Sequence, residues 1–212
     1  MLSTISILVL GFVLGMRHAT DADHVVAVTT IVSRQPSLSK ASLIGALWGV
    51  GHTATILLVG GAIVVFRLTI PPRLGLAMEF VVALMLILLG VLNLSGRTHQ
   101  ALHGAMRPLL VGFVHGLAGS AFVAMLVLTA IPNAVWGIAY LLVFGVGTIG
   151  GMMLVTLAIA APSALTARRF GSMQQYLRVA SGVASIAFGL FLAHQVGIRD
   201  GLFTGNPIWS PR

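Results

Sequence analysis

Five ionisable side chains stand close together near the start of the chain, in the run Arg17–His24 (RHATDADH). Imidazole suits nickel, cobalt, copper and zinc, and carboxylate adds the negative charge that a divalent ion requires. At about 100° per residue, His18, Asp21 and His24 form one stripe along a helix face, whereas Asp23 lies on another face. Asp23 joins the stripe only if the helix unwinds locally or a neighbouring group meets it there. The run therefore predicts a site for a divalent metal ion.

The composition places these groups in a membrane protein. Of 212 residues, 58% are hydrophobic and only 8% are charged, and the mean hydropathy is +1.04, whereas a soluble domain has about 25% charged residues. A soluble core of this size could not bury so much apolar surface. There is no cysteine, which excludes disulfides, thiolate metal sites and iron–sulfur clusters. The net charge of +8 comes from scattered basic residues, which we interpret as interfacial anchors and not as contacts to nucleic acid.

Six stretches are long and apolar enough to cross about 30 Å of hydrocarbon as helices. We expect an all-α, polytopic membrane helix bundle that forms one transmembrane domain over residues 1–212, with a polar tail at 199–212. The expected spans are Ser3–Ser33, Ala41–Phe66, Leu74–Ser95, Pro108–Ile131, Ala134–Ala161 and Tyr176–Ile198. Prolines fall between these spans, where a missing N–H does no harm: Pro36, Pro71, Pro72, Pro132 and Pro162.

The first stretch is too long for one straight crossing, since 31 residues at about 1.5 Å each would reach about 46 Å. The helix is therefore either strongly tilted or broken near the charged run. Irregular backbone at membrane depth survives only inside protein or beside a water-filled cavity. Both outcomes place the ionisable side chains away from lipid.

A charge at the bilayer centre costs at least about 2.5–3.5 kcal/mol, so this many ionisable groups need a neutralising partner. A bound cation is one such partner. The alternative is a self-satisfied polar network, in which Arg17 pairs with Asp21 and the histidines bond backbone carbonyls. We favour the cation because such a network would be costly in lipid, and we interpret Arg17 as a structural counter-charge.

The two halves of the chain resemble each other. The matches are GFVLGM at 11–16 with GFVHGL at 112–117, WGVG at 48–51 with FGVG at 144–147, and loosely LLGVL at 88–92 with AFGLF at 187–191. The offsets of 101, 96 and about 99 residues predict two three-helix repeats, at about 1–96 and 107–198. An odd number of crossings inverts the second copy, and inverted repeats are typical of transporters.

Two further histidines stand inside apolar stretches. His52 lies mid-span between small residues that permit close helix approach. His115 takes the place of Leu14 in the repeat, one turn before His18, so it could face the same cavity. Each is either a metal ligand or a hydrogen-bonded packing residue. Thr148 occupies the repeat position of His52, and we expect it to serve packing.

The motif resembles a known family. His18, Asp23 and His24 reproduce the His-x4-Asp-His signature of the nickel/cobalt transporter family, and Gly51-His52-Thr53 resembles its second motif, Gly-His-Ser/Thr. The chain is shorter than the eight-helix members and looks like the six-helix branch found among urease- and hydrogenase-associated membrane proteins. The resemblance implies metal uptake in which His18, Asp23, His24 and His52 are essential. The predicted metal ligands are His18, Asp21, Asp23, His24, His52 and His115.

The expected function is that of a permease, not an enzyme, which carries Ni²⁺ or Co²⁺ across the cell membrane into the cytoplasm. Seven basic residues flank the loops after the first, third and fifth spans, against four on the other side, which places both termini outside the cytoplasm. We expect the ion and the bilayer as partners, no nucleic acid and no tightly bound cofactor. An intramembrane metalloenzyme and a scaffold for metal delivery are the alternatives, and homo-oligomers and metalloenzyme-maturation partners stay open.

Other polar side chains are expected to serve structure. Glu79 could pair with Arg73 at the interface, and Asn93 could hydrogen-bond between helices. Trp209 is interpreted as a headgroup anchor. The loop histidines at 99 and 103 are interpreted as interfacial.

Overall fold

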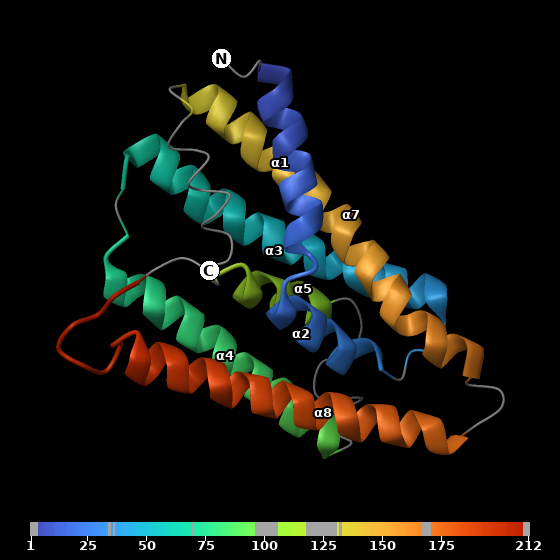
Figure 1. Cartoon of the computed structure of the whole chain (residues 1–212). Coiled ribbons are helices and arrows are strands. Elements are labelled where there is room, and N and C mark those ends of the chain that lie inside the picture. Colours follow the sequence, from blue (N-terminus) through green and yellow to red (C-terminus); the bar gives the residue numbers. More distant parts are fainter. Residues whose placement is uncertain are drawn as a thin grey trace.

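The computed structural model describes residues 4–209 except 34, 36, 69, 96–105, 118–130, 132 and 167–170. All regular elements in this part of the chain are helices, which confirms the expected all-α fold (Figure 1). The helices are α1 (Thr4–His18), α2 (Ala22–Val32), α3 (Leu38–Phe66), α4 (Pro72–Leu94), α5 (Met106–His115), α7 (Ala134–Thr166) and α8 (Gly171–His194), which continues into a π-helical turn, η3 (Gln195–Arg199).

Four helices are long and apolar enough to cross a membrane, and α1 with α2 makes a fifth candidate if the bent pair forms one span. The four are Leu38–Phe66, Pro72–Leu94, Ala134–Pro162 and Gln175–Arg199. The expected span Pro108–Ile131 falls only partly within the described residues, where α5 is followed by a turn at 116–117. The predicted membrane bundle is therefore supported by both the length and the composition of its helices.

The first stretch is broken, as one of the two sequence interpretations expects. Helix α1 ends at His18, and α2 begins at Ala22 with its axis bent by 54°. Backbone bonds from Thr20 N to Arg17 O (2.8 Å) and from Asp21 N to His18 O (3.1 Å) form the connecting turn. The break places the ionisable run across two helix ends, with His18 and His24 buried and Arg17 exposed.

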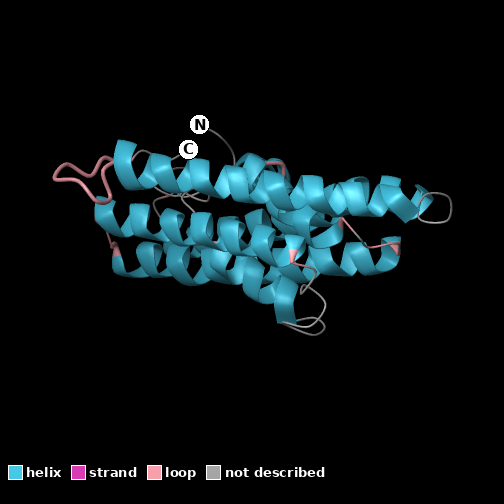
Figure 2. Cartoon of the chain, turned by 90° about the horizontal axis from the view of Figure 1, so that it is seen from below, coloured by secondary structure: helices cyan, strands magenta, loops and turns pink. Residues whose placement is uncertain are grey.

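Helix α2 is packed among the longer helices. The most extensive contacts join α3 to α7, α4 to α8, α1 to α7 and α3 to α5, while α2 touches α8, α4, α7 and α3. Figure 1 shows α4 and α8 side by side, with α2 between this pair and the α1–α3–α7 group, and Figure 2 shows the same helices stacked in layers. Ala27, Val28 and Val32 of α2 are buried in the main apolar core. A short helix held on several sides can position side chains firmly.

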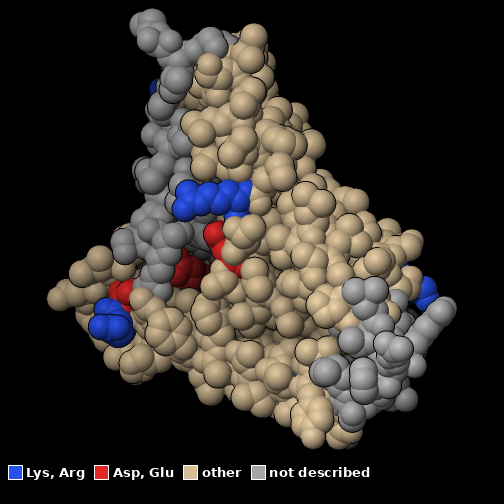
Figure 3. All heavy atoms as spheres, turned by 45° about the vertical axis from the view of Figure 1, so that its right-hand side comes forward, with Lys and Arg blue, Asp and Glu red and all other residues tan. Residues whose placement is uncertain are grey.

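The outward faces of the long helices carry large apolar side chains. Leu58 of α3, Leu88 of α4 and Val146 of α7 each expose more than half of their surface. Figure 3 shows one face of the molecule, which is mostly neutral and carries a few charged groups near its centre. Exposed apolar surface on this scale matches a lipid environment.

Glycines permit close contact at two helix crossings. Gly15 of α1 lies against the carbonyl of Phe144 in α7, and Gly112 of α5 lies against the carbonyl of Trp48 in α3, so a Cβ at either glycine would clash. Small residues at such crossings let backbones approach closely. The two glycines make the same kind of contact, so Gly15 in the first half corresponds to Gly112 in the second half. This correspondence is an offset of 97 residues, whereas the match of GFVLGM with GFVHGL gave an offset of 101. The predicted register of α5 is thus wrong by one turn, and His115 corresponds to His18 and not to Leu14.

Two proline predictions need correction. Pro162 lies inside α7, which continues to Thr166, and Pro72 occupies the first turn of α4. The first turn tolerates proline because its N–H has no helical partner. Within α7, proline lacks the N–H for one backbone bond, and the helix nevertheless continues to Thr166.

The C-terminal segment folds back onto α4. Trp209 Nε1 donates a hydrogen bond to Glu79 Oε1 (2.8 Å), and the Trp209 ring covers Gly75. Phe203 packs edge-on against Phe80 with ring centroids 5.2 Å apart. Trp209 is therefore docked on α4, and its role as a headgroup anchor stays a prediction. Asn93 does join two helices, since its Nδ2 donates to two oxygen atoms of α8 at 3.1 and 2.9 Å.

Candidate metal site

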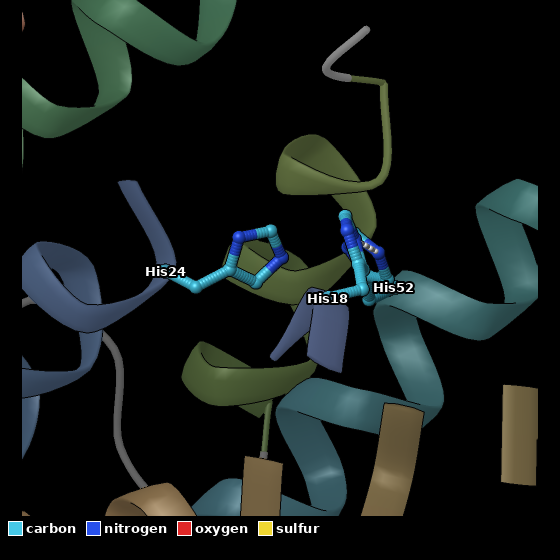
Figure 4. Close-up of side chains that lie close together, drawn as sticks. All are labelled: His18, His24 and His52. Atoms are coloured by element: carbon cyan, nitrogen blue, oxygen red, sulfur yellow. Dashed lines mark hydrogen bonds between the residues drawn. The ribbon is translucent and has the colours of Figure 1, made fainter. Parts of the chain in front are cut away.

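Three buried histidines from three helices converge on one point. His18 is the last residue of α1, His24 lies in the first turn of α2, and His52 is in the middle of α3, with exposed fractions of 6%, 1% and 0%. His18 Nε2 and His52 Nε2 are 2.8 Å apart, and the His24 ring centroid lies 4.5 and 5.0 Å from theirs (Figure 4). One donor atom from each lies within 4.8 Å of the others, so the three could hold a metal ion.

A second group shares one member with the first. Asp23 Oδ1 lies 3.0 Å from His24 Nδ1, and Asp23 Oδ2 lies 3.0 Å from His115 Nε2. His115 is fully buried at the end of α5. Donor atoms of Asp23, His24 and His115 also lie within 4.8 Å of one another. These residues could hold a metal ion with one carboxylate and two imidazoles.

The two aspartates each orient an imidazole. Asp21 Oδ2 lies 2.9 Å from His18 Nδ1, so the Nε2 of His18 can turn its lone pair toward His52. Asp23 acts in the same way on His24 through Nδ1. Carboxylates that bond the second nitrogen of a ligating histidine fix its tautomer and raise its basicity. The Asp21 side chain is 40% exposed and the Asp23 side chain 16%, so Asp21 is the acidic group of the site nearest to the surface.

The helix break explains how Asp23 reaches the site. Asp21 occupies the N-cap of α2 in an extended conformation, with φ −61° and ψ 146°. Asp23 Oδ1 accepts the backbone N–H of His24 (2.9 Å), as carboxylates near helix N-termini often do. On one straight helix Asp23 would face away from His18. The break and the approach of His115 bring Asp23 into the cluster. The two conditions expected from the sequence, local unwinding of the helix and a neighbouring group that meets Asp23, are thus both met.

The polar network considered as the alternative differs from the observed contacts. Among the described residues, Arg17 forms no ion pair with Asp21, whose partner is His18. The histidines contact one another and the carboxylates, and none bonds a backbone carbonyl through its ring in this part of the chain. Buried imidazole nitrogens of His24, His52 and His115 have no hydrogen-bond partner within the described structure. An unpaired buried donor or acceptor costs about 1–3 kcal/mol. Of these nitrogens, His24 Nε2 belongs to the ring that meets those of His18 and His52, so it is the candidate for binding an ion.

Aromatic rings close the sides of the cluster. Trp48 stacks on His24 with ring centroids 5.7 Å apart and meets His115 edge-on at 5.6 Å. Phe144 lies 5.7 Å from His18. These rings exclude water and lower the local dielectric, which strengthens the interaction of charged groups inside. Thr148 is buried, and its hydroxyl bonds to Phe144 O in its own helix, as expected for a packing residue.

A sequence comparison identifies the family. The chain is 35% identical to the urease accessory protein UreH of Bacillus sp. (strain TB-90) over 219 aligned residues, which cover 94% of this chain and 95% of that protein. The chain belongs to the UreH family. Two chloroplast proteins of Arabidopsis thaliana, FOR GROWTH AND FERTILITY 2 and 1, are 26% and 24% identical, and the chain spans about half of their length (54% and 56%). No protein-family model matches the chain, and no solved structure matches it.

In this UreH family member, the structure brings all of the sequence-predicted site residues into one cluster: His18, Asp21, Asp23, His24, His52 and His115. His99 and His103 lie outside the described residues. Sequence analysis missed the wall residues Trp48 and Phe144 as parts of the site. The signal for Trp48 was its spacing, because it stands four residues before His52 and therefore on the same face of α3.

Proposed function

We propose that the protein is a membrane permease that carries Ni²⁺, Co²⁺ or both into the cytoplasm. The observation that carries this proposal is the convergence of three buried imidazoles, from the ends of two helices and the middle of a third, with carboxylates behind two of them. The ion is the substrate, and Asp23 and the four clustered histidines bind it as it crosses.

The position of the cluster supports transport. It lies at a break in a membrane helix, and broken helices inside a bundle are typical of transporter binding sites. The ligands are buried among packed helices, while Asp21 is partly exposed and would meet an arriving cation first. A resident structural ion would not need such an acidic group at the surface.

The donor set supports a transition metal of intermediate softness. Neutral imidazoles suit nickel, cobalt and zinc, and no thiolate is available in the sequence. The resemblance of the motif to nickel/cobalt transporters favours nickel or cobalt, and the name of the relative UreH, a urease accessory protein, agrees with nickel. An inside-negative potential favours the inward movement of a doubly charged ion by about 4.6 kcal/mol per 100 mV, which is twice the single-charge value.

The test is uptake of radioactive nickel into liposomes that contain only this protein, with cobalt, zinc and manganese as competitors. Wild type should accumulate nickel when an inside-negative potential is imposed, and His18→Ala should fall to the level of empty liposomes. His194→Ala is the matched control because His194 is exposed at the end of α8, outside the cluster. If wild type takes up no nickel, the protein is a scaffold or an enzyme and not a permease. Unchanged uptake by His18→Ala would contradict the site.

A further inference from the structure

We propose that the ion occupies two alternative positions that share His24 and that it passes from one to the other during each transport cycle. This inference rests on the proposed function. Position A consists of His18, His24 and His52. Position B consists of Asp23, His24 and His115. Both groups have donor atoms close enough to hold one ion.

His24 can serve both positions because its two ring nitrogens face different neighbours. Its Nδ1 lies 3.0 Å from Asp23 Oδ1, on the side of position B. Its Nε2 is buried with no hydrogen-bond partner within the described structure, and the ring is turned toward His18 and His52 (Figure 4). The Nε2 therefore belongs to position A and the Nδ1 to position B.

The two positions exclude each other. A neutral imidazole carries a proton on one nitrogen and a free lone pair on the other. An ion in position A binds the lone pair of His24 Nε2. The N–H at Nδ1 then donates a hydrogen bond to Asp23. An ion in position B takes the lone pair of Nδ1, and the proton is then on Nε2. Passage from position A to position B therefore requires the release of one proton from Nδ1 and the uptake of one proton at Nε2. The chain therefore binds one ion at a time, although it offers two sets of ligands.

The move between positions changes the ligands and the charge around the ion. The ion leaves His18, His52 and the Nε2 of His24, and it takes Asp23, His115 and the Nδ1 of the same His24 ring. The His24 and His115 rings are already in contact, with centroids 4.2 Å apart. Position A offers neutral imidazoles only, whereas position B adds a carboxylate that attracts the cation directly. These differences separate the two positions in affinity.

The helices that supply the two positions also differ. All ligands of position A come from α1, α2 and α3, in the first half of the chain, whereas position B adds His115 from α5, in the second half. His18 and His115 each end their helix, and the glycine contacts of α1 and α5 make them equivalent. Relative motion of the halves would therefore change position B while leaving position A intact. Two such positions would allow relative motion of the halves to transfer the ion from position A to position B.

The test combines binding and transport with purified full-length protein. Equilibrium dialysis with Ni²⁺ should give one bound ion per wild-type protein. His52→Ala disrupts position A and keeps position B, whereas His115→Ala disrupts position B and keeps position A, so each single variant should also bind one ion. The double variant should lose binding at least tenfold beyond either single variant. X-ray absorption at the nickel edge should count more imidazoles around the ion in His115→Ala than in His52→Ala. In liposomes, both single variants should lose at least tenfold in uptake rate.

Several results would overturn the two-position proposal. Two bound ions in wild type would contradict the sharing of His24, and loss of all binding in either single variant would indicate one site. Wild-type uptake by both His115→Ala and the more conservative His115→Gln, each checked by size-exclusion chromatography for folding, would show that position B is not used. The proposed function fails only if wild type itself takes up no nickel, so the two failures are distinguishable.

Discussion

Substitution of Gly51 by alanine tests whether close helix packing sets the geometry of the site. Gly51 of α3 precedes His52 and lies against α5, the helix that carries His115. A methyl group at position 51 would lie 2.9 Å from Phe113 N and 3.0 Å from Leu109 C, and closer still to Leu109 O. These neighbours are backbone atoms of a helix, so they cannot move away by a change of rotamer.

The displacement follows from these distances. Ordinary van der Waals contact begins near 3.4 Å, so one helix must shift by at least 0.5 Å, the difference between 3.4 and 2.9 Å. Metal–ligand distances must lie within about 0.2 Å of their ideal values. Whichever helix gives way, His52 or His115 is displaced by more than this tolerance from the other ligands of its group. Loss of an outer-shell partner alone costs about 10–100-fold in metal affinity, and a misplaced ligand should cost at least as much.

The assay is the rate of nickel uptake into liposomes, together with thermal unfolding in detergent. Gly51→Ala should lower uptake at least tenfold and destabilise the fold by about 1–3 kcal/mol, as overpacking does. Gly61→Ala is the matched control in the same helix, because a Cβ there meets nothing within 4 Å. It should keep wild-type uptake and be neutral or stabilising by up to about 1 kcal/mol. Equal uptake and equal stability of the two variants would refute the argument from packing.

Three further variants test other contacts. Asp21→Asn weakens the bond to His18 Nδ1, and equilibrium dialysis should show a nickel Kd raised about 10–100-fold; an unchanged Kd would exclude an orienting role. Trp209→Phe removes the N–H that donates to Glu79 but keeps a ring against α4, so limited proteolysis should remove the C-terminal segment faster while uptake stays normal; equal cleavage rates would contradict the docking. Asn93→Leu removes two hydrogen bonds to α8, and thermal unfolding should show a loss of about 0.6 kcal/mol in stability for each bond. Wild-type stability of this variant would show that the two bonds do not stabilise the fold.

The core of the site could be predicted because its residues are close together in the sequence. Ionisable groups inside apolar stretches are costly unless they are partnered, and this alone selects the run Arg17–His24. The length of the first stretch also indicated a tilt or a break. His52 was a candidate because it is a histidine in the middle of a long apolar helix. These inferences depend on the free-energy cost of ionisable groups in lipid and on the length of the apolar stretches. Neither quantity requires knowledge of how the helices pack.

The role of His115 depended on packing that the sequence does not specify. Glycine and valine are abundant in this chain, so a short match such as GFVLG with GFVHG can slip by one helical turn. The crossing contacts of Gly15 and Gly112 fix the register instead, and they pair His115 with His18. Trp48 was missed as a wall of the site for a related reason, since an aromatic residue in a span usually serves packing. Pro162 shows the opposite error, because the expectation that proline ends a helix placed it outside the span, whereas α7 continues to Thr166.

The backbone itself supplies part of the charge that a cation needs in this bundle. Helices α1 and α5 both end at a histidine of the cluster, so the partial negative charges of two helix C-termini lie beside the candidate ligands. Each terminus corresponds to about half of an elementary charge, and such ends favour cations. Helix α2 begins at the same place, and its N-terminus stabilises the carboxylate of Asp23. A continuous first helix would remove one of these negative ends and the N-terminus that stabilises Asp23. The break between α1 and α2 therefore adds a negative helix end beside His18 and a positive helix end that stabilises Asp23 as a carboxylate, and it lets Asp23 reach the other ligands.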